Sequence, residues 1–233
     1  MEIIAEIGQN HNGEMNLAIE LIHAAKECGA DVAKFQVYDA RALFPKEGNE
    51  WFEYNCKTEL SREQLMLLSQ ECKKVDIEFM ASVFDVERVG WLEECGVERY
   101  KVASRSVKDA ALIDAIAATG KPILVSLGMW DGPEFPQING SAKVDFLYCV
   151  SKYPTPLEDL KLAHVDFAES YAGFSDHSEG ITAAIVACSR GARILEKHFT
   201  LDQSMYGPDH VCSMCPKELT NLHRIKSEIL RCL

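Results

Sequence analysis

Short apolar segments alternate with amphipathic segments along the whole chain. Each apolar segment is rich in Val, Ile, Phe or Ala and is apolar at nearly every position, which is typical of a parallel strand that is buried on both faces. From this pattern we predict eight strands, over residues 2–8, 31–37, 77–83, 98–104, 122–127, 144–150, 171–176 and 193–199.

Between these strands the apolar positions recur with the period of an α-helix. The clearest predicted helices are 14–28, 62–74 and 216–231. Ser61 and Gln64 have the spacing of a capping box at the start of the second helix, and Pro216 suits the first turn of the third.

One expected β–α unit departs from the pattern. Two prolines and two glycines lie between Met129 and Val144. Because proline breaks a helix interior and glycine disfavours it, we predict that the helix of this fifth unit is reduced to a loop.

A repeat links the ends of helices to the strands that follow them. Gly29, Gly96, Gly120 and Gly191 each end a predicted helix, and the next strand closes on a polar residue. Glycine is the usual left-handed stop of a helix. Eight such units predict an α/β fold of the closed (β/α)8 type, a TIM barrel, with residues 1–233 as a single domain; a doubly wound open sheet is the alternative.

Composition and charge narrow the possible partners. The net charge of −12 argues against nucleic acid and against an anionic membrane surface, because both require a basic footprint. Nine cysteines, an odd number, follow an N-terminus without a visible secretory signal. We therefore expect reduced thiols and a cytoplasmic location. Cys212 and Cys215 have the spacing of a metal or redox pair, but no second pair accompanies them, and we interpret the spacing as incidental.

The candidate chemistry lies at the carboxyl ends of the strands, where barrel enzymes place their sites. Lys34 and Lys101 interrupt apolar strands at equivalent positions of the repeat. A buried lysine without an anion is costly, so two of them predict a site for a phosphate and a carboxylate. The alternative is that each lysine snorkels or pairs with a neighbouring glutamate. The serines at strand ends are Ser82, Ser104, Ser126 and Ser175.

Two histidines fall at the ends of adjacent predicted strands, His177 and His198. Their imidazoles could converge on a divalent ion and leave open positions for a substrate. The alternative is a pair of hydrogen-bonded histidines in a polar core. A third histidine, His11, lies in a polar loop that it is expected to shape together with its asparagine neighbours.

Several of these residues fall in segments that resemble one enzyme family, the N-acetylneuraminate (sialic acid) synthases. The segments follow the order of the family along nearly the whole chain: Ala5-Glu-Ile-Gly-Gln-Asn-His-Asn-Gly13, Lys34-Phe-Gln36, Tyr100-Lys-Val-Ala-Ser104, Tyr153-Pro-Thr-Pro156, Phe174-Ser-Asp-His177, Glu196-Lys-His-Phe-Thr200 and Gly207-Pro-Asp-His210. Seven motifs in register are far more specific than any one of them.

The resemblance implies a transferase that joins phosphoenolpyruvate to an N-acetylated amino sugar such as N-acetylmannosamine, with Mn2+ or Mg2+. It makes His177 and His198 the metal ligands. It gives catalytic roles to Glu6, Lys34, Lys101, Tyr153 and Asp209. It gives substrate-binding roles to Gln36, Ser82, Ser104, Ser126, Ser151 and Ser175. Within these sets the lysines and serines hold phosphoenolpyruvate, whereas Glu6, Gln36, Tyr153 and Asp209 face the sugar.

Two departures from the family pattern keep other hypotheses open. Ser106 stands where the family usually has a carboxylate, and a hydroxyl manages protons poorly near neutral pH. The printed chain ends at Leu233, whereas typical members continue into a small antifreeze-like domain that completes the sugar site of a partner subunit. The alternatives are a related synthase acting on a smaller aldehyde and a non-catalytic barrel that relies on a separate chain. The expectation of a homodimer rests on the resemblance alone, because typical members of the family form dimers.

Overall fold

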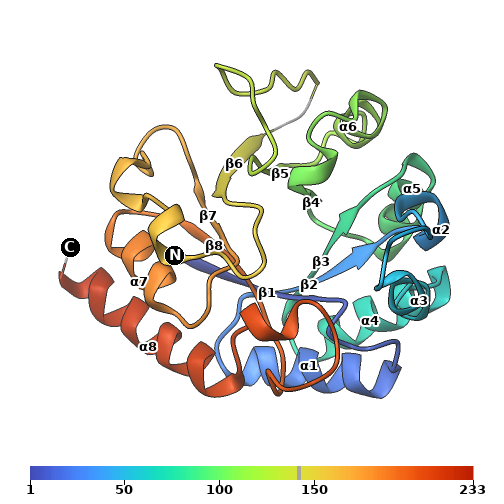
Figure 1. Cartoon of the computed structure of the whole chain (residues 1–233), viewed down its shortest axis with the longest axis horizontal. Helices are drawn as coiled ribbons and strands as arrows, with labels where there is room; N and C mark the ends of the chain where they lie inside the picture. The colour runs from blue at the N-terminus through green and yellow to red at the C-terminus, as the bar shows by residue number, and fades with distance from the viewer. Residues whose placement is uncertain (141–142, 233) are drawn as a thin grey trace.

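The computed structural model describes residues 1–140 and 143–232. Its eight parallel strands close into a barrel in chain order, β1 through β8, with β1 paired to β8 (Figure 1). The predicted (β/α)8 barrel is thereby confirmed, and the open sheet is excluded. All eight predicted strands are present: β1 Glu2–Gly8, β2 Val32–Val37, β3 Glu78–Val83, β4 Tyr100–Val102, β5 Ile123–Ser126, β6 Val144–Cys149, β7 Gly173–Asp176 and β8 Ile194–His198.

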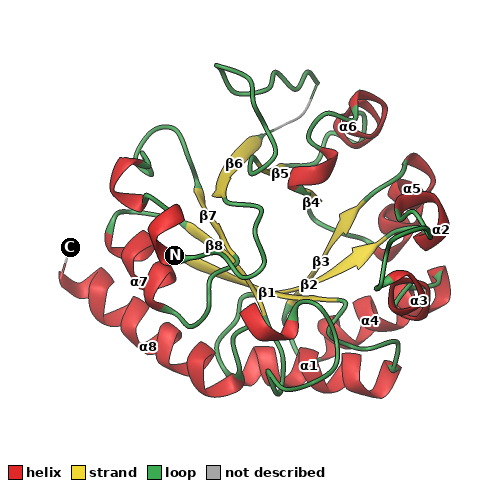
Figure 2. Cartoon of the chain, viewed as in Figure 1, coloured by secondary structure: helices red, strands yellow, loops and turns green. Residues whose placement is uncertain are grey.

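Helices pack around the outside of the barrel (Figure 2). They are α1 Met15–Glu27, α2 Ala40–Leu43, α3 Phe52–Lys57, α4 Arg62–Lys74, α5 Val86–Cys95, α6 Ala110–Ala117, α7 Thr182–Ser189 and α8 Pro216–Cys232. Four short 3-10 turns join them: η1 Ser104–Ser106, η2 Leu157–Asp159, η3 Leu162–His164 and η4 His210–Cys212.

Several local predictions are confirmed. The capping box of α4 is complete, because the Ser61 hydroxyl accepts from the Gln64 backbone N–H and the Gln64 side chain accepts from the Ser61 N–H. Pro216 is the first residue of α8. The helix-end glycines all have positive φ, from 70° at Gly120 to 95° at Gly29, a conformation that other residues adopt only with strain.

The connection from β5 to β6 contains no helix among its described residues, 127–140 and 143, as the prolines and glycines predicted. Figure 2 draws these described residues as a loop. Strand β4 is shorter than predicted because the chain turns into η1 directly after Ala103. Within the part of the chain that the structure describes, no helix is long and apolar enough to cross a membrane.

The interior of the barrel changes character along its axis. A small apolar cluster fills the end where the strands begin, and its members are Ile4, Val32, Met80, Leu124, Leu147, Ala172 and Ile194. Side chains two residues apart along a strand point to the same face. The residues two places beyond several of these positions are polar: Glu6, Lys34, Ser82, Ser126 and Glu196. An apolar floor therefore lies beneath a polar layer at the carboxyl ends of the strands.

A glycine at the start of β7 permits close approach of β8. An added Cβ at Gly173 would lie 2.0 Å from the backbone oxygen of Ile194, which cannot move without breaking the sheet.

We expect Gly173→Ala to lower the free energy of unfolding by ~3 kcal/mol in urea denaturation, because the barrel must deform to admit the methyl group. Gly90→Ala is the matched control: its added methyl meets open space on α5, so it should be neutral or stabilising by up to ~1 kcal/mol. Equal effects of the two substitutions would contradict the argument.

The loop after β1 is built around His11, as expected. His11 is buried, and its Nδ1 accepts from the Gly13 backbone N–H at 3.2 Å. Burial lowers the pKa of His11 from 6.5 to about 4. Because the unfolded chain takes up a proton below its own pKa while the folded protein does not, this histidine makes stability rise with pH across the window from about 4 to 6.5.

We expect acidification from about pH 7.5 to pH 5 to cost about 2 kcal/mol of unfolding free energy through His11 alone. His11→Asn should remove that part of the pH dependence, measured by urea denaturation at both pH values. His164→Asn is the control, because His164 is exposed on η3 and should leave the pH dependence unchanged. A wild-type slope in His11→Asn would refute the assignment.

Candidate active site

The polar layer opens into two adjoining cavities at the carboxyl ends of the strands. The inner cavity, of about 60 Å³, has room for only a few water molecules. The outer cavity, of about 520 Å³, is within the range of small-molecule sites. The two cavities share six lining residues: Gln36, Phe84, Ala103, Ser104, Tyr153 and His198.

Every residue predicted for the site lines one or both cavities. The predicted residues that line only the inner cavity are Glu6, Lys34, Ser82, Lys101, Ser126, Ser175 and His177. Ser151 and Asp209 line only the outer cavity. Ser151 is therefore set apart from the other serines expected to hold phosphoenolpyruvate. Ser106 is buried but lines neither cavity.

A cluster of four buried charges forms the centre of the inner cavity. Lys34 Nζ lies 2.6 Å from Glu6 Oε2 and 3.4 Å from Glu196 Oε2, and Lys101 Nζ lies 3.5 Å from Glu196 Oε1. The Ser175 hydroxyl donates to Glu196 Oε1 at 2.7 Å. The lysines thus do pair with glutamates, but with partners on β1 and β8 rather than with neighbours in the sequence.

The titration of this cluster follows from burial and mutual charge. Burial raises the pKa of Glu196, but Lys101 and Lys34 outweigh burial and hold it at about 2. Burial lowers the pKa of Lys34, yet Glu196 and Glu6 raise it above its usual value. The pKa of Lys101 is lowered, because burial outweighs its one close carboxylate. Lys101 is therefore the less well compensated of the two ammonium groups and the one with more to gain from a bound anion.

Hydroxyl groups on neighbouring strands leave hydrogen-bonding capacity free. Ser126 Oγ and Ser151 Oγ are buried and have no hydrogen-bond partner in the described structure. Ser104 Oγ, in contrast, accepts from the Gly128 backbone N–H at 3.0 Å and donates to Cys149 Sγ at 3.5 Å. The free hydroxyls of Ser126 and Ser151, with the two lysines, suit a ligand rich in anionic oxygen atoms.

The two predicted histidines do converge. The ring centroids of His177 and His198 are 5.8 Å apart, and Tyr153 packs against His177 at 4.1 Å. His177 Nδ1 contacts the Val150 carbonyl oxygen at 3.1 Å, which leaves Nε2 free. Metal-binding histidines usually donate their other ring nitrogen to a carbonyl or carboxylate in this way.

His198 is held differently. Its Nδ1 is buried, has no hydrogen-bond partner among the described residues, and lies 3.9 Å from Asp209 Oδ2. The pair therefore fits a cation held by two imidazoles with its other positions open to water or substrate. Among the described residues, no group of three or more His, Cys, Asp or Glu side chains is arranged to hold a metal ion.

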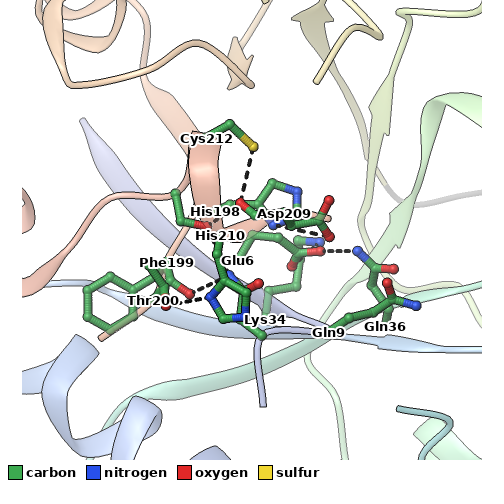
Figure 3. Close-up of polar contacts among 12 residues, drawn as sticks. Glu6, Gln9, Lys34, Gln36, His198, Phe199, Thr200, Asp209, His210 and Cys212 are labelled. Carbon is green, nitrogen blue, oxygen red and sulfur yellow. Dashed lines mark hydrogen bonds and ion pairs between the residues drawn. The ribbon is translucent and has the colours of Figure 1, made fainter. Parts of the chain in front are cut away.

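The loop that carries Asp209 is fixed by short contacts (Figure 3). The Asp209 carbonyl accepts from the Cys212 thiol at 3.3 Å and from the Ser213 hydroxyl at 2.7 Å. The Glu6 carboxylate accepts from Gln36 Nε2 at 2.9 Å, which joins the strand ends of β1 and β2 beneath this loop. Tyr153 lines both cavities and keeps 51% of its surface exposed.

Several residues that line the cavities were not predicted for the site, among them Glu196, Cys149 and Arg105. Glu196 stands in the predicted β8 segment, but its spacing gave no sign that it would meet lysines from β2 and β4. Cys149 lies 3.7 Å from His177 Nδ1, and contact with the histidine lowers the pKa of its thiol despite the opposing effect of burial. Arg105 lines the outer cavity with its guanidinium over the Phe44 ring. The alternation of side chains from Ile194 could have shown that Glu196 points into the barrel, but not which lysines it meets.

Known proteins resemble this chain in sequence and in structure. The NeuB family matches residues 21–231. The N,N'-diacetyllegionaminic acid synthase of Legionella pneumophila is 37% identical, over 94% of this chain and 69% of that protein. The N-acetylneuraminate-9-phosphate synthase of Homo sapiens is 34% identical, over 95% of this chain and 68% of the human protein.

A solved structure agrees with these relatives. The N-acetylneuraminic acid (sialic acid) synthetase of Leptospira borgpetersenii, in complex with citrate, superimposes with a TM-score of 0.92 at 33% identity. The superposition covers 99% of this chain and 84% of that one. Sequence and fold together show that this chain belongs to the NeuB family, whose members include sialic acid and legionaminic acid synthases.

Proposed function

We propose that this protein condenses phosphoenolpyruvate with an N-acetylated amino sugar, of the N-acetylmannosamine type, to give a 2-keto-3-deoxy sugar acid and phosphate. The observation that carries the proposal is the placing of two buried lysines and a convergent histidine pair around one cavity. Membership of a family of sugar-acid synthases supports the same reaction.

Phosphoenolpyruvate binds where the two cavities join, with its anionic groups directed into the inner cavity, which is too small to hold the whole molecule. Its phosphate and carboxylate oxygens accept from the ammonium groups of Lys34 and Lys101 and from the free hydroxyls around them. Since Glu6 and Glu196 already occupy these lysines, binding exchanges carboxylate contacts for ligand contacts. The ammonium groups of the lysines stabilise the negative charge of the ligand, and a bound anion in turn favours the protonated form of Lys101.

The sugar binds in the outer cavity with its open-chain aldehyde at the boundary between the two cavities. Tyr153, Gln36 and His198 line both sides of that boundary, and Asp209 faces the outer cavity. A divalent ion held by His177 and His198, Mn2+ or Mg2+, would polarise the aldehyde oxygen. Gln36 and Asp209 offer hydrogen bonds to sugar hydroxyls and so orient the aldehyde carbon toward the inner cavity.

The reaction forms one carbon–carbon bond. Carbon 3 of phosphoenolpyruvate attacks the aldehyde carbon, and the aldehyde oxygen takes up a proton to become a hydroxyl group. Water adds to carbon 2 and loses one proton. The bond from carbon 2 to the bridging oxygen then breaks, the phosphate leaves with that oxygen, and loss of the second water proton gives the keto group at carbon 2. Lys34 and Lys101 hold the phosphate oxygens as charge develops on them. Glu6, in hydrogen-bond contact with Gln36 and Lys34, is the carboxylate placed to accept a water proton.

A coupled assay of phosphate release tests the proposal. The wild-type protein should release phosphate from phosphoenolpyruvate only when Mn2+ and an N-acetylhexosamine are both present. His198→Ala should lower kcat/KM at least about a hundredfold, because it removes one of two ion ligands and leaves the fold intact.

His164→Ala is the matched control, because it removes an exposed imidazole on η3 that lines neither cavity, and it should retain full activity. Turnover of simple aldehydes but not of N-acetylhexosamines would replace the proposed sugar with a smaller acceptor. Phosphate release that needs no aldose, or a fully active His198→Ala variant, would refute the proposal. Activity that appears only after a second protein is added would favour a partner-dependent barrel.

A further inference from the structure

A buried ion pair at the edge of the inner cavity lies beside the two histidines and has no role in the proposed reaction. Asp176 is the last residue of β7, and Lys197 is its partner in register on β8. Lys197 Nζ lies 3.1 Å from Asp176 Oδ2, and both side chains are 0% exposed. In the sequence these residues directly precede His177 and His198.

The contacts of this pair enclose His177. Asp176 Oδ1 accepts from the Ser178 backbone N–H at 2.8 Å and from the Ser178 hydroxyl at 2.7 Å. Lys197 Nζ also donates to the Ser178 carbonyl oxygen. Lys197 therefore contacts the residues on both sides of His177, and its own neighbour is His198. We call the three residues Asp176, Ser178 and Lys197 the β7–β8 clasp.

Stability alone is a poor explanation for the clasp. Removing two charges completely from water is costly, and apolar residues of similar volume often replace a buried ion pair without loss of stability. The clasp does supply geometry, because it ties the turn that carries His177 to the strand that carries His198. Other backbone contacts hold each histidine separately: the His177 carbonyl accepts from Thr155 N–H at 2.9 Å, and the His198 carbonyl accepts from Met214 N–H at 2.7 Å.

We propose that Asp176 and Lys197 are positioning residues that set the distance between the His177 and His198 rings for one divalent cation. This inference rests on the proposed function, since it assumes that the histidines share an ion. Metal–nitrogen bonds tolerate little change in length; zinc–nitrogen distances, for example, are ~2 Å. A shift of either ring therefore lowers the affinity for the ion even when both ligands remain. Neither clasp side chain needs to touch the ion.

The double substitution Asp176→Asn with Lys197→Met tests the inference. It removes both charges while it keeps side-chain volume and an acceptor for the Ser178 N–H. Each single substitution leaves one buried charge unpaired and should lower Tm more than the double one. We expect the double variant to remain folded and to bind Mn2+ with a Kd roughly ten- to hundredfold weaker, measured by electron paramagnetic resonance of free Mn2+ well below Tm.

Arg99→Met is the matched control. Arg99 bridges Glu2 and Glu78 at the opposite end of the barrel, with 2.6 Å and 2.8 Å contacts, so its loss should lower Tm and leave the Kd for Mn2+ unchanged. A folded double variant with the wild-type Kd would overturn the positioning role, as would an equal loss of affinity in Arg99→Met. If the wild-type protein takes up no Mn2+, the proposed function fails, and this inference fails with it.

Discussion

The pairing of β1 with β8 is the interaction on which the site depends. In that closed sheet Glu6 is in register with Lys34 on one side and with His198 on the other. The same closure carries Glu196 from β8 to within reach of Lys34 and Lys101. An open sheet would leave the first and last strands at opposite edges, and neither the charge cluster nor its contact with the histidines could form.

The alternation of side chains along the strands then places the polar residues of the site directly above the apolar residues that pack in the barrel. Ile4 and Ile194 belong to the apolar floor of the barrel, and Glu6 and Glu196 stand two residues further along the same strands. The floor excludes water from below, which strengthens the interactions among the charges above it. The four buried charges sum to zero, so the barrel can hold two lysines ready for an anion without burying a net charge.

The sequence left two interpretations of the lysines open, binding of an anion and pairing with glutamates, and this balance of charges makes the two compatible. Lys34 and Lys101 are paired with glutamates, yet the pairing is uneven, because Glu196 is shared and only Lys34 has Glu6 as a second partner. Burial lowers the pKa of Lys101, and its one close carboxylate does not offset that effect. An oxygen-rich anion, such as the proposed substrate phosphoenolpyruvate, would give the Lys101 ammonium group the second anionic partner that it lacks.

The sequence determined the fold almost entirely, because strand burial, helix period and helix-end glycines such as Gly29 are local signals that agree with one another. It also located the predicted site residues, since a barrel gathers the carboxyl ends of its strands at one rim. Only the tertiary structure decided which carboxylates meet the lysines and that Ser106 lies outside the cavities. Nor could the sequence show that Asp176 and Lys197 are paired beside the histidines. Contacts across strands depend on register and on barrel closure, and no periodicity within one segment encodes either of them.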